Sequence, residues 1–442
     1  MSDTLFPLPP AEAAAATSEA ETQGGEARLE RADRQQLRFE PVTVDELVPA
    51  EHVVRAVWKY VEGLPLGPLY DKILAVQGQA GRPAIDPKLL VALWLYATIS
   101  GVGSARELAE LTTEHNAYRW LCGGVSVCYH TLSDFRTAHA AWCDQMLTES
   151  VAVLLHAQVV DLKRIAEDGL RVRASAGASS FRRRETLEGC LAEAQAQVAE
   201  LKRAAEAHPE AAGTKSAQAR ERAAREREER VRQALEEMRQ VEAAKKEQER
   251  AKARVSTTDA EARVMKMGDG GFRPAYNVQL AATTEGQAIV AVSVTNSASD
   301  MGQMPPMVQQ VRQRFGTTPR EWLADGGHAK KEDIEAVSAK GTTVYAPVQK
   351  SKKEDVDPHQ PRATDAEAIA AWRQRMGTPE AKEIYKDRAA TIECVNAQAR
   401  QRELKQVTVR GTAKVLAVAL WYALAHNVMR AIAMGVVACA GP

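Results

Sequence analysis

Three acidic residues stand out because their types and spacing suit a site that binds metal ions. Asp168 lies in RIAEDGLRVRAS and Asp325 in WLADGGHAKKEDI, and we expect each to stand where a β-strand ends. Glu393 lies in YKDRAATIECVNAQAR, whose pattern predicts a helix. Sites in open α/β sheets form outside the carboxyl ends of strands, and hard divalent cations prefer carboxylate oxygens. Two such cations can activate an attacking oxygen and stabilise a leaving oxygen in phosphoryl transfer.

Each of these acids also has an ordinary structural explanation. Asp168 is followed by glycine, which is typical of a turn, and Asp325 could cap a following helix. Glu393 would also suit a solvated helix face. Two further acids, Asp269 in GDGGF and Asp300 in SASD, fit local roles in a turn and in a loop before a helix, so we do not expect them in the site.

The residues around Glu393 favour a role in binding phosphate. Arg388 precedes it by five residues and Arg400 follows it by seven, about one and two helical turns. Basic residues on both sides of a metal-binding glutamate can bind backbone phosphates, and Tyr385 can add a phenolic contact. An intrahelical salt bridge is the alternative explanation for Arg388 alone.

Composition predicts a soluble and largely helical protein of two or three domains. The chain has 442 residues, of which 45% are hydrophobic and 5% aromatic. Its 58 basic and 58 acidic residues cancel, which argues mildly against nucleic-acid binding by the surface as a whole. Arginines nevertheless cluster around Asp168, so a basic cleft is compatible with the neutral total. They are Arg164, Arg171, Arg173, Arg182, Arg183 and Arg184.

Cysteine usage and hydropathy predict a cytoplasmic protein. Six cysteines without paired spacing indicate free thiols in a reducing compartment. The cysteines and histidines between Cys122 and His139 match no zinc spacing, so we expect buried structural residues there. No secretory signal pattern is found at the N-terminus. Residues 413–439 are apolar but contain Lys414 and Arg430, which favours a buried C-terminal helix over a membrane span.

The N-terminal third predicts a disordered tail and a helical domain. Residues 1–36 are rich in Ala, Glu, Thr and Pro and show no apolar period. Residues 37–158 predict short helices joined by glycine turns, with Ser104 as an N-cap three residues before Glu107. This pattern is typical of a helix-turn-helix-like DNA-binding domain, and a generic helical bundle fits it equally well.

Basic residues of the helical domain are the candidates for contacting DNA. A further helix is expected to open at Thr131 or Ser133, and it would carry Arg136. Arg136 is therefore the first candidate, ahead of Arg119 and Arg106. The alternative is that the region serves only as a helical scaffold or a dimer interface.

A charged insertion interrupts the next domain. Residues 159–180 predict its first strand, and residues 181–255 then predict two long helices. Apolar residues recur in steps of four and three over residues 187–205, as in a heptad seam. Pro and Gly at 209–213 separate this helix from a second one at 216–254. The pattern predicts an inserted coiled-coil hairpin, and a solvated spacer is the alternative.

Strands return after residue 256. PAYNVQLAATT and QAIVAVSVTN, separated by Glu285 and Gly286, predict a β-hairpin. An amphipathic helix is expected at 304–315, a short strand in EWLADGG, a helix at 330–340 and another strand in TTVYAPV. This order predicts an α/β fold, a mixed sheet flanked by helices, built from residues 159–180 and 256–442.

The chain resembles bacterial insertion-sequence transposases with a ribonuclease-H-like DDE core. The resemblance covers about residues 39–430. Its matching strings are GRPAIDPKLLVALWLYATISGVGSARELAEL, YHTLSDFR, DGLRVRASAG, GDGGFRPAYNVQ, VTNSASDMGQMPPMV, LADGGHAKKEDIEA, YKDRAATIECVNAQAR and RGTAKVLAVALWYALAHNVMR. The resemblance implies a ribonuclease-H-like fold for the mixed sheet. It also implies that Asp168, Asp325 and Glu393 form the catalytic and metal-binding triad.

The glutamate signature of the family corresponds to Tyr385, Arg388 and Arg400, with two departures. The commoner signature places its arginine one residue nearer to the glutamate, and it ends in lysine where this chain has Arg400. His328 stands where the family usually has an aromatic residue after the second aspartate. Arginine preserves the charge at position 400. We expect all four of these side chains to contact DNA.

The resemblance implies an enzyme that cleaves the ends of its mobile element and joins them to target DNA. Mg²⁺ is the expected cofactor, and Mn²⁺ is expected to substitute for it. The expected partners are terminal inverted repeats, target DNA and at least one further copy of the chain in the DNA complex. Two alternatives are an inactive DNA-binding relative that represses transposition, and a metal-dependent nuclease without strand transfer.

Overall fold

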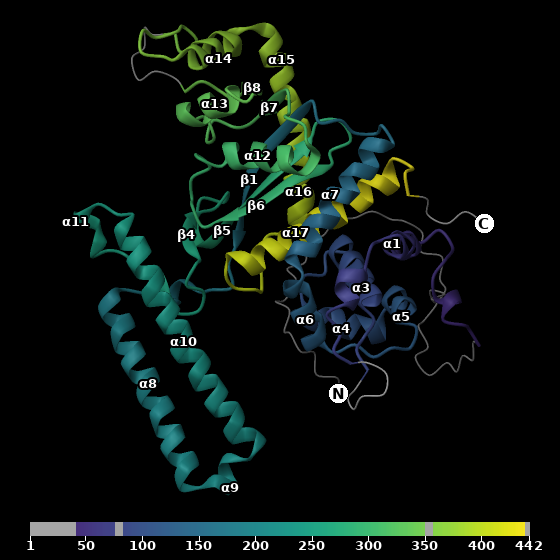
Figure 1. The fold of residues 1–442 in the computed structure, drawn as a ribbon, viewed down its shortest axis with the longest axis vertical. Helices are drawn as coiled ribbons and strands as arrows, with labels where there is room; N and C mark the ends of the chain where they lie inside the picture. The colour runs from purple at the N-terminus through teal and green to yellow at the C-terminus, as the bar shows by residue number, and fades with distance from the viewer. Residues whose placement is uncertain (1–40, 76–82, 350–356, 438–442) are drawn as a thin grey trace, which may run out of the picture. The chain divides into compact units, whose positions relative to one another are not determined.

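The computed structural model describes residues 41–75, 83–349 and 357–437. The predicted tail at residues 1–36 lies outside these described residues. The described chain is a mixed α/β structure in which helices flank one mixed sheet (Figure 1). This confirms the predicted fold class.

Strand β1 (Arg164–Arg173) lies at the centre of the sheet. The order is β4-β5-β1-β7-β8, and β6 pairs with the same edge of β5 as β4 does. Strand β5 is antiparallel to β1, whereas β7 and β8 are parallel to it. The other bounds are β4 (Arg263–Lys266), β5 (Phe272–Thr283), β6 (Ile289–Thr295), β7 (Glu321–Leu323) and β8 (Thr343–Tyr345).

The prediction that Asp168 ends its strand is wrong. Strand β1 continues to Arg173, and Asp168 pairs with Leu280 of β5 in the middle of it. The following Gly169 makes no turn, and it serves instead to leave space for side chains on the neighbouring strand. Strand β7 ends at Leu323, two residues before Asp325.

Helix α17 (Thr412–Ala433) joins the sheet to the N-terminal helices. It packs on β6 and also on α3 and α7, and the indole of Trp421 donates a hydrogen bond of 3.0 Å to the Arg136 carbonyl. Among the described helices, α17 is the one long and apolar enough to cross a membrane, but 78% of its apolar window is buried inside the protein. Buried residues of the helices and the sheet therefore form one continuous core.

The N-terminal helices mostly follow the predicted pattern. Ser104 caps α4 by accepting the backbone N–H of Glu107 at 3.4 Å, as predicted. Helix α6 begins at Tyr129 and not at Thr131 or Ser133, because Cys128 has extended backbone angles and takes the N-cap position. The bounds are α1 (Val53–Glu62), α2 (Gly67–Tyr70), α3 (Pro87–Ile99), α4 (Ala105–Glu114), α5 (Asn116–Cys122), α6 (Tyr129–Ala138) and α7 (Ala140–His156), after a short 3-10 helix (Asp45–Leu47).

The insertion forms a helical hairpin. Figure 1 shows α8 (Arg184–Ala207) and α10 (Lys215–Ala243) side by side, with α9 (Pro209–Ala212) between their ends. Helix α10 ends at Ala243, earlier than the predicted 254, and α11 (Glu247–Arg250) follows it. The short strands β2 (Phe181–Arg182) and β3 (Val255–Ser256) pair antiparallel and close the base of the insertion.

The C-terminal half supplies the helices beside the sheet. The predicted amphipathic helix is α12 (Met304–Phe315), and α13 (Lys331–Ser338) lies between β7 and β8 in sequence. Helix α14 (Glu367–Gly377) leads into α15 (Pro379–Arg388), a π-helix (Ala389–Glu393) and α16 (Cys394–Gln401). The last three segments follow one another without a break and carry the residues around Glu393.

Candidate active site

Asp168 and Asp325 lie close together because β1 and β7 are parallel neighbours. Ala166 pairs with Leu323, and each aspartate follows its paired residue by two positions. The Asp168 carboxylate accepts a hydrogen bond of 3.1 Å from the side-chain amide of Asn396 on α16. Burial and the nearby charge of Asp325 raise the pKa of Asp168, although the Arg388 guanidinium opposes this rise.

The π-helix aligns Arg388 with Glu393. Residues five apart in an α-helix lie about 140° apart around the axis, whereas a π-turn brings residues i and i+5 together. Here Arg388 Nη1 donates to Glu393 Oε1 at 2.9 Å. The π-turn thus brings these two side chains together although five positions separate them in the sequence.

Arg388 links the predicted carboxylates. Its side chain is only 11% exposed and its Nη2 lies 3.4 Å from Asp168 Oδ2, so one guanidinium contacts both Asp168 and Glu393. Burial opposes its charge, but the carboxylates of Asp168 and Asp325 outweigh burial and raise the pKa of Arg388. Glu393 itself is 57% exposed and lies on the solvent side of this cluster.

The oxygen atoms of these side chains are of the type that binds divalent cations, but they are not arranged as a metal site. In the described part of the chain, no three Asp, Glu, His or Cys side chains lie close enough together to hold a metal ion. The side chains that meet around Arg388 nevertheless offer hard oxygen atoms, which Mg²⁺ and Mn²⁺ prefer. The Asn396 Oδ1 atom beside them is buried and accepts no hydrogen bond. These residues therefore fit a hard divalent cation by donor type.

His328 is buried, so its side chain is not available to contact DNA as predicted. Its side chain is 0% exposed and its Nδ1 lies 2.7 Å from Asp325 Oδ1. On the other side, Nε2 lies 3.1 Å from Gln279 Oε1 and 3.8 Å from Glu167 Oε1. Burial disfavours the imidazolium, but the Glu167 and Asp325 carboxylates outweigh burial and raise the pKa of His328 to about 9.

Glu167 is a buried acid that no sequence pattern singles out. Its Oε2 accepts the Trp322 indole N–H at 2.7 Å, while its Oε1 has no hydrogen-bond partner. Burial raises the pKa of Glu167 to about 7, against the opposing charge of His328. Glu167 directly precedes Asp168 on β1, so the alternation of side chains along the strand directs the two residues to opposite faces of the sheet.

Arg136 is also buried, so it is not available to DNA as predicted. Its Nη1 donates to the Gly103 carbonyl at 2.6 Å, and its guanidinium lies 4.4 Å from the centre of the Trp94 ring. Its place one helical turn after the buried Leu132 is the sequence signal for this burial. Arg119 and Arg106, in contrast, are exposed.

The remaining predicted residues surround the carboxylates. Tyr385 is half-buried, and burial together with the charges of Asp325, Asp168 and Glu393 raises the pKa of its phenol. Arg400 is exposed at the end of α16. Tyr385 thus lies within electrostatic reach of all three predicted catalytic acids.

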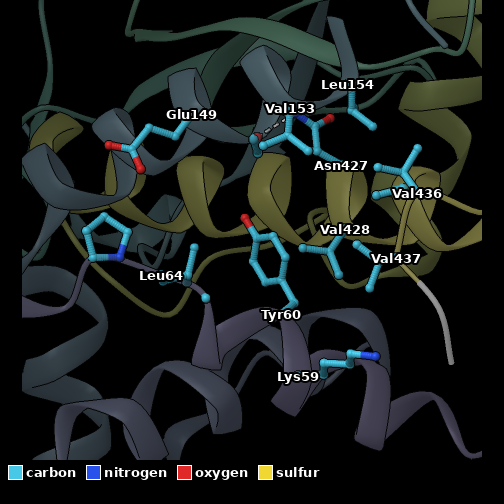
Figure 2. A pocket seen from close by; sticks show the side chains of 14 residues that line it. Lys59, Tyr60, Leu64, Glu149, Val153, Leu154, Asn427, Val428, Val436 and Val437 are labelled. Atoms are coloured by element: carbon cyan, nitrogen blue, oxygen red, sulfur yellow. Dashed lines mark hydrogen bonds between the residues drawn. The ribbon is translucent and has the colours of Figure 1, made fainter. Parts of the chain in front are cut away.

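A mainly apolar pocket lies elsewhere in the described chain. Figure 2 shows Tyr60, Val428 and Val437 around a pocket of about 450 Å³. Its walls come mainly from α1, α7 and α17, and none of the predicted site residues lines it. We therefore do not assign the chemistry to this pocket.

Comparison with known families agrees with the fold. Residues 218–428 match the family model of a transposase DDE domain, and residues 42–138 match that of a transposase domain, DUF772. No curated protein and no solved structure gives a match. The DDE match includes Asp325 and Glu393, whereas Asp168 precedes it. The fold and this match define a DDE-type transposase domain. With the DUF772 domain before it, the chain is placed among the insertion-sequence transposases, which confirms the resemblance found in the sequence.

Proposed function

We propose that this transposase cleaves the ends of its own mobile element and joins them to target DNA, with Asp168, Asp325 and Glu393 as its catalytic acids. The observation that supports this proposal is their approach to one another around Arg388. The acids come from β1, from the loop that follows its neighbour β7 and from a helical segment, so they are distant in sequence.

The acids would hold divalent cations, for which Mg²⁺ is the candidate and Mn²⁺ a substitute. Such cations, when bound, supply Lewis-acid activation of the attacking oxygen and stabilise the leaving oxygen. Arg388 pairs with Asp168 and Glu393, and it would also bind a DNA phosphate. Tyr385 and Arg400 would add contacts to the backbone of the DNA.

DNA binding would extend over the N-terminal helices. Arg106 and Arg119 are exposed there and replace Arg136 as the residues to test first. A phosphate contact by either should lower affinity for all sequences and reduce its salt dependence. Because two element ends must be paired, we expect at least a dimer in the DNA complex.

The test uses full-length protein, element-end DNA, a target plasmid and Mg²⁺ or Mn²⁺. We expect Asp168→Asn, Asp325→Asn and Glu393→Gln each to abolish cleavage and joining while DNA binding is retained, because each change removes an anionic ligand at nearly constant volume. Asp269→Asn is the matched control, since this acid is exposed and pairs with Arg273. Retained cleavage in any of the three variants would remove that acid from the proposed site. Cleavage without joined products in the unmodified protein would reduce the function to that of a nuclease.

A further inference from the structure

A chain of buried and partly buried hydrogen bonds leads from Arg171 to Asp325. In the loop before α12, Asp300 pairs with Arg171, whose Nη2 lies 2.8 Å from Asp300 Oδ2. Gln279 of β5 donates from Nε2 to Asp300 Oδ1 at 2.7 Å. The Oε1 atom of the same Gln279 lies 3.1 Å from His328 Nε2, and His328 Nδ1 lies 2.7 Å from Asp325. Asp300, which the sequence suggested to be a local loop residue, is thus connected to the candidate site.

The donor and acceptor roles along this chain are fixed by Asp300. Burial disfavours the charged form, but hydrogen bonds from Arg171 and Asn277 keep the pKa of Asp300 below its ordinary value. An ionised carboxylate only accepts hydrogen bonds, so Gln279 must direct its amide nitrogen to Asp300 and its oxygen to His328. The His328 ring therefore donates from Nε2 to Gln279 and from Nδ1 to Asp325.

The surroundings leave these side chains little freedom. Gln279 and His328 are both 0% exposed. Gln279 pairs across the sheet with Gly169, the residue after Asp168. A Cβ atom at position 169 would lie 2.3 Å from Asp300 Oδ1 and 2.7 Å from Gln279 Nε2. Gly169 therefore provides the space in which Gln279 meets Asp300.

We propose that Asp300, Gln279 and His328 are positioning residues that orient the Asp325 carboxylate for a divalent cation. The inference rests on the proposed function, because it assumes that Asp325 is a metal ligand. Groups that hydrogen-bond to a ligand fix its direction, and their loss typically lowers metal affinity about 10- to 100-fold. Asp300 would act on Asp325 only through the intervening amide and imidazole.

The first experiment measures Mn²⁺ binding by calorimetry on the full-length protein without DNA. We expect Gln279→Leu to lower the affinity about tenfold, since the His328 ring loses its second anchor. The matched control is Gln310→Leu, which removes two side-chain hydrogen bonds to the backbone of Val292 on β6. The control should reduce thermal stability but leave Mn²⁺ affinity unchanged. If Gln279→Leu behaves like Gln310→Leu, Gln279 has only a structural role and the proposal is overturned.

The second experiment is a double-mutant cycle. His328→Asn retains a donor near the position of Nδ1 but is too short to reach Gln279. We expect it to lower Mn²⁺ affinity about as much as Gln279→Leu does, and the double variant to show no further loss. Additive losses would show that Gln279 does not act through His328 and would refute the positioning chain.

A third variant separates this inference from the proposed function. Asp325→Asn should abolish Mn²⁺ binding in the same assay. If it does, and Gln279→Leu has no effect, only the positioning role is refuted. If Asp325→Asn binds Mn²⁺ normally, Asp325 is not a ligand, and the proposed function and this inference both fail.

Discussion

Removing the charge of Arg388 should destabilise the protein in the absence of divalent cations. The pair of Arg388 with Glu393 contributes little, because Glu393 is 57% exposed. The pair with Asp168 is different, since these side chains are 11% and 19% exposed and their charged atoms lie 3.4 Å apart. Coulomb attraction at this distance is about 5 kcal/mol for an effective dielectric constant of 20, and the desolvation of both ions offsets much of it. Arg388→Met would leave the Asp168 carboxylate beside that of Asp325 without the positive charge of the guanidinium. We expect a loss of about 2–3 kcal/mol in the free energy of unfolding, somewhat below the loss for breaking a fully buried pair.

Cations should compensate for this loss. We expect Mn²⁺ to stabilise Arg388→Met more than the unmodified protein, because a bound cation would neutralise the same carboxylates without competing with the guanidinium. A ligand at 100 times its Kd adds about 2.7 kcal/mol, so the difference is measurable by thermal unfolding in EDTA and in Mn²⁺. Arg400→Met is the control, because Arg400 lies exposed at the end of the same helical segment. Equal stability of Arg388→Met and the unmodified protein in EDTA, or an equal gain from Mn²⁺ in both, would refute this reasoning.

Three further predictions address the fold around the site. Burial lowers the pKa of His426 to about 4, below an unfolded value of about 6.5. Its contribution to stability is therefore present above pH 6.5 and is lost as the pH falls towards 4. His426→Gln should remove roughly 3 kcal/mol of the pH dependence of the free energy of unfolding, measured by urea unfolding at several pH values. Trp421→Ala should lower the free energy of unfolding by about 3–5 kcal/mol. Circular dichroism should still show one unfolding transition, because α17 belongs to the core shared by the sheet and the N-terminal helices. Two separate transitions would contradict a shared core. Deletion of Ala390 should convert the π-turn into α-helix, keep Arg388 near Glu393 and preserve DNA cleavage. A one-residue deletion inside α16 should abolish cleavage. Loss of cleavage in both variants would contradict the proposed alignment.

Local sequence signals predicted most elements of the fold. The hairpin of β5 and β6 follows from two β-branched segments around Glu285 and Gly286, and the structure has its turn there. Helix α12 has the predicted bounds, since apolar spacing begins it and Gly316 ends it with a left-handed backbone. Ser104 caps α4 as expected. Each of these features depends on residues within a few positions of one another, so the sequence alone carries the information.

The site was harder to predict because its contacts join distant parts of the chain. Arg136 is buried partly because Trp421, 285 residues later, packs over its helix and hydrogen-bonds to its carbonyl. Gly169 follows Asp168 as it would in a turn, but its purpose is to leave space for Asp300, which lies far along the chain. His328 lies near the predicted acid, yet its burial depends on β1 and β5. Sequence spacing therefore identified the candidate acids but not the side chains that orient them.

The same shared core determines how DNA binding should be tested. The turn after α3 packs against the end of α16, where a Cβ atom on Gly101 would lie 3.3 Å from the Gln401 carbonyl. Helix α17 covers α3, α6 and α7. A fragment that ends at residue 158 would expose these apolar faces, so its failure to bind DNA would not distinguish a wrong assignment from loss of the fold. Substitutions of Arg106 and Arg119 in the full chain avoid this ambiguity. Because the N-terminal helices and the candidate site share one core, DNA bound by those helices would be placed relative to the acids by packing and not by a flexible linker.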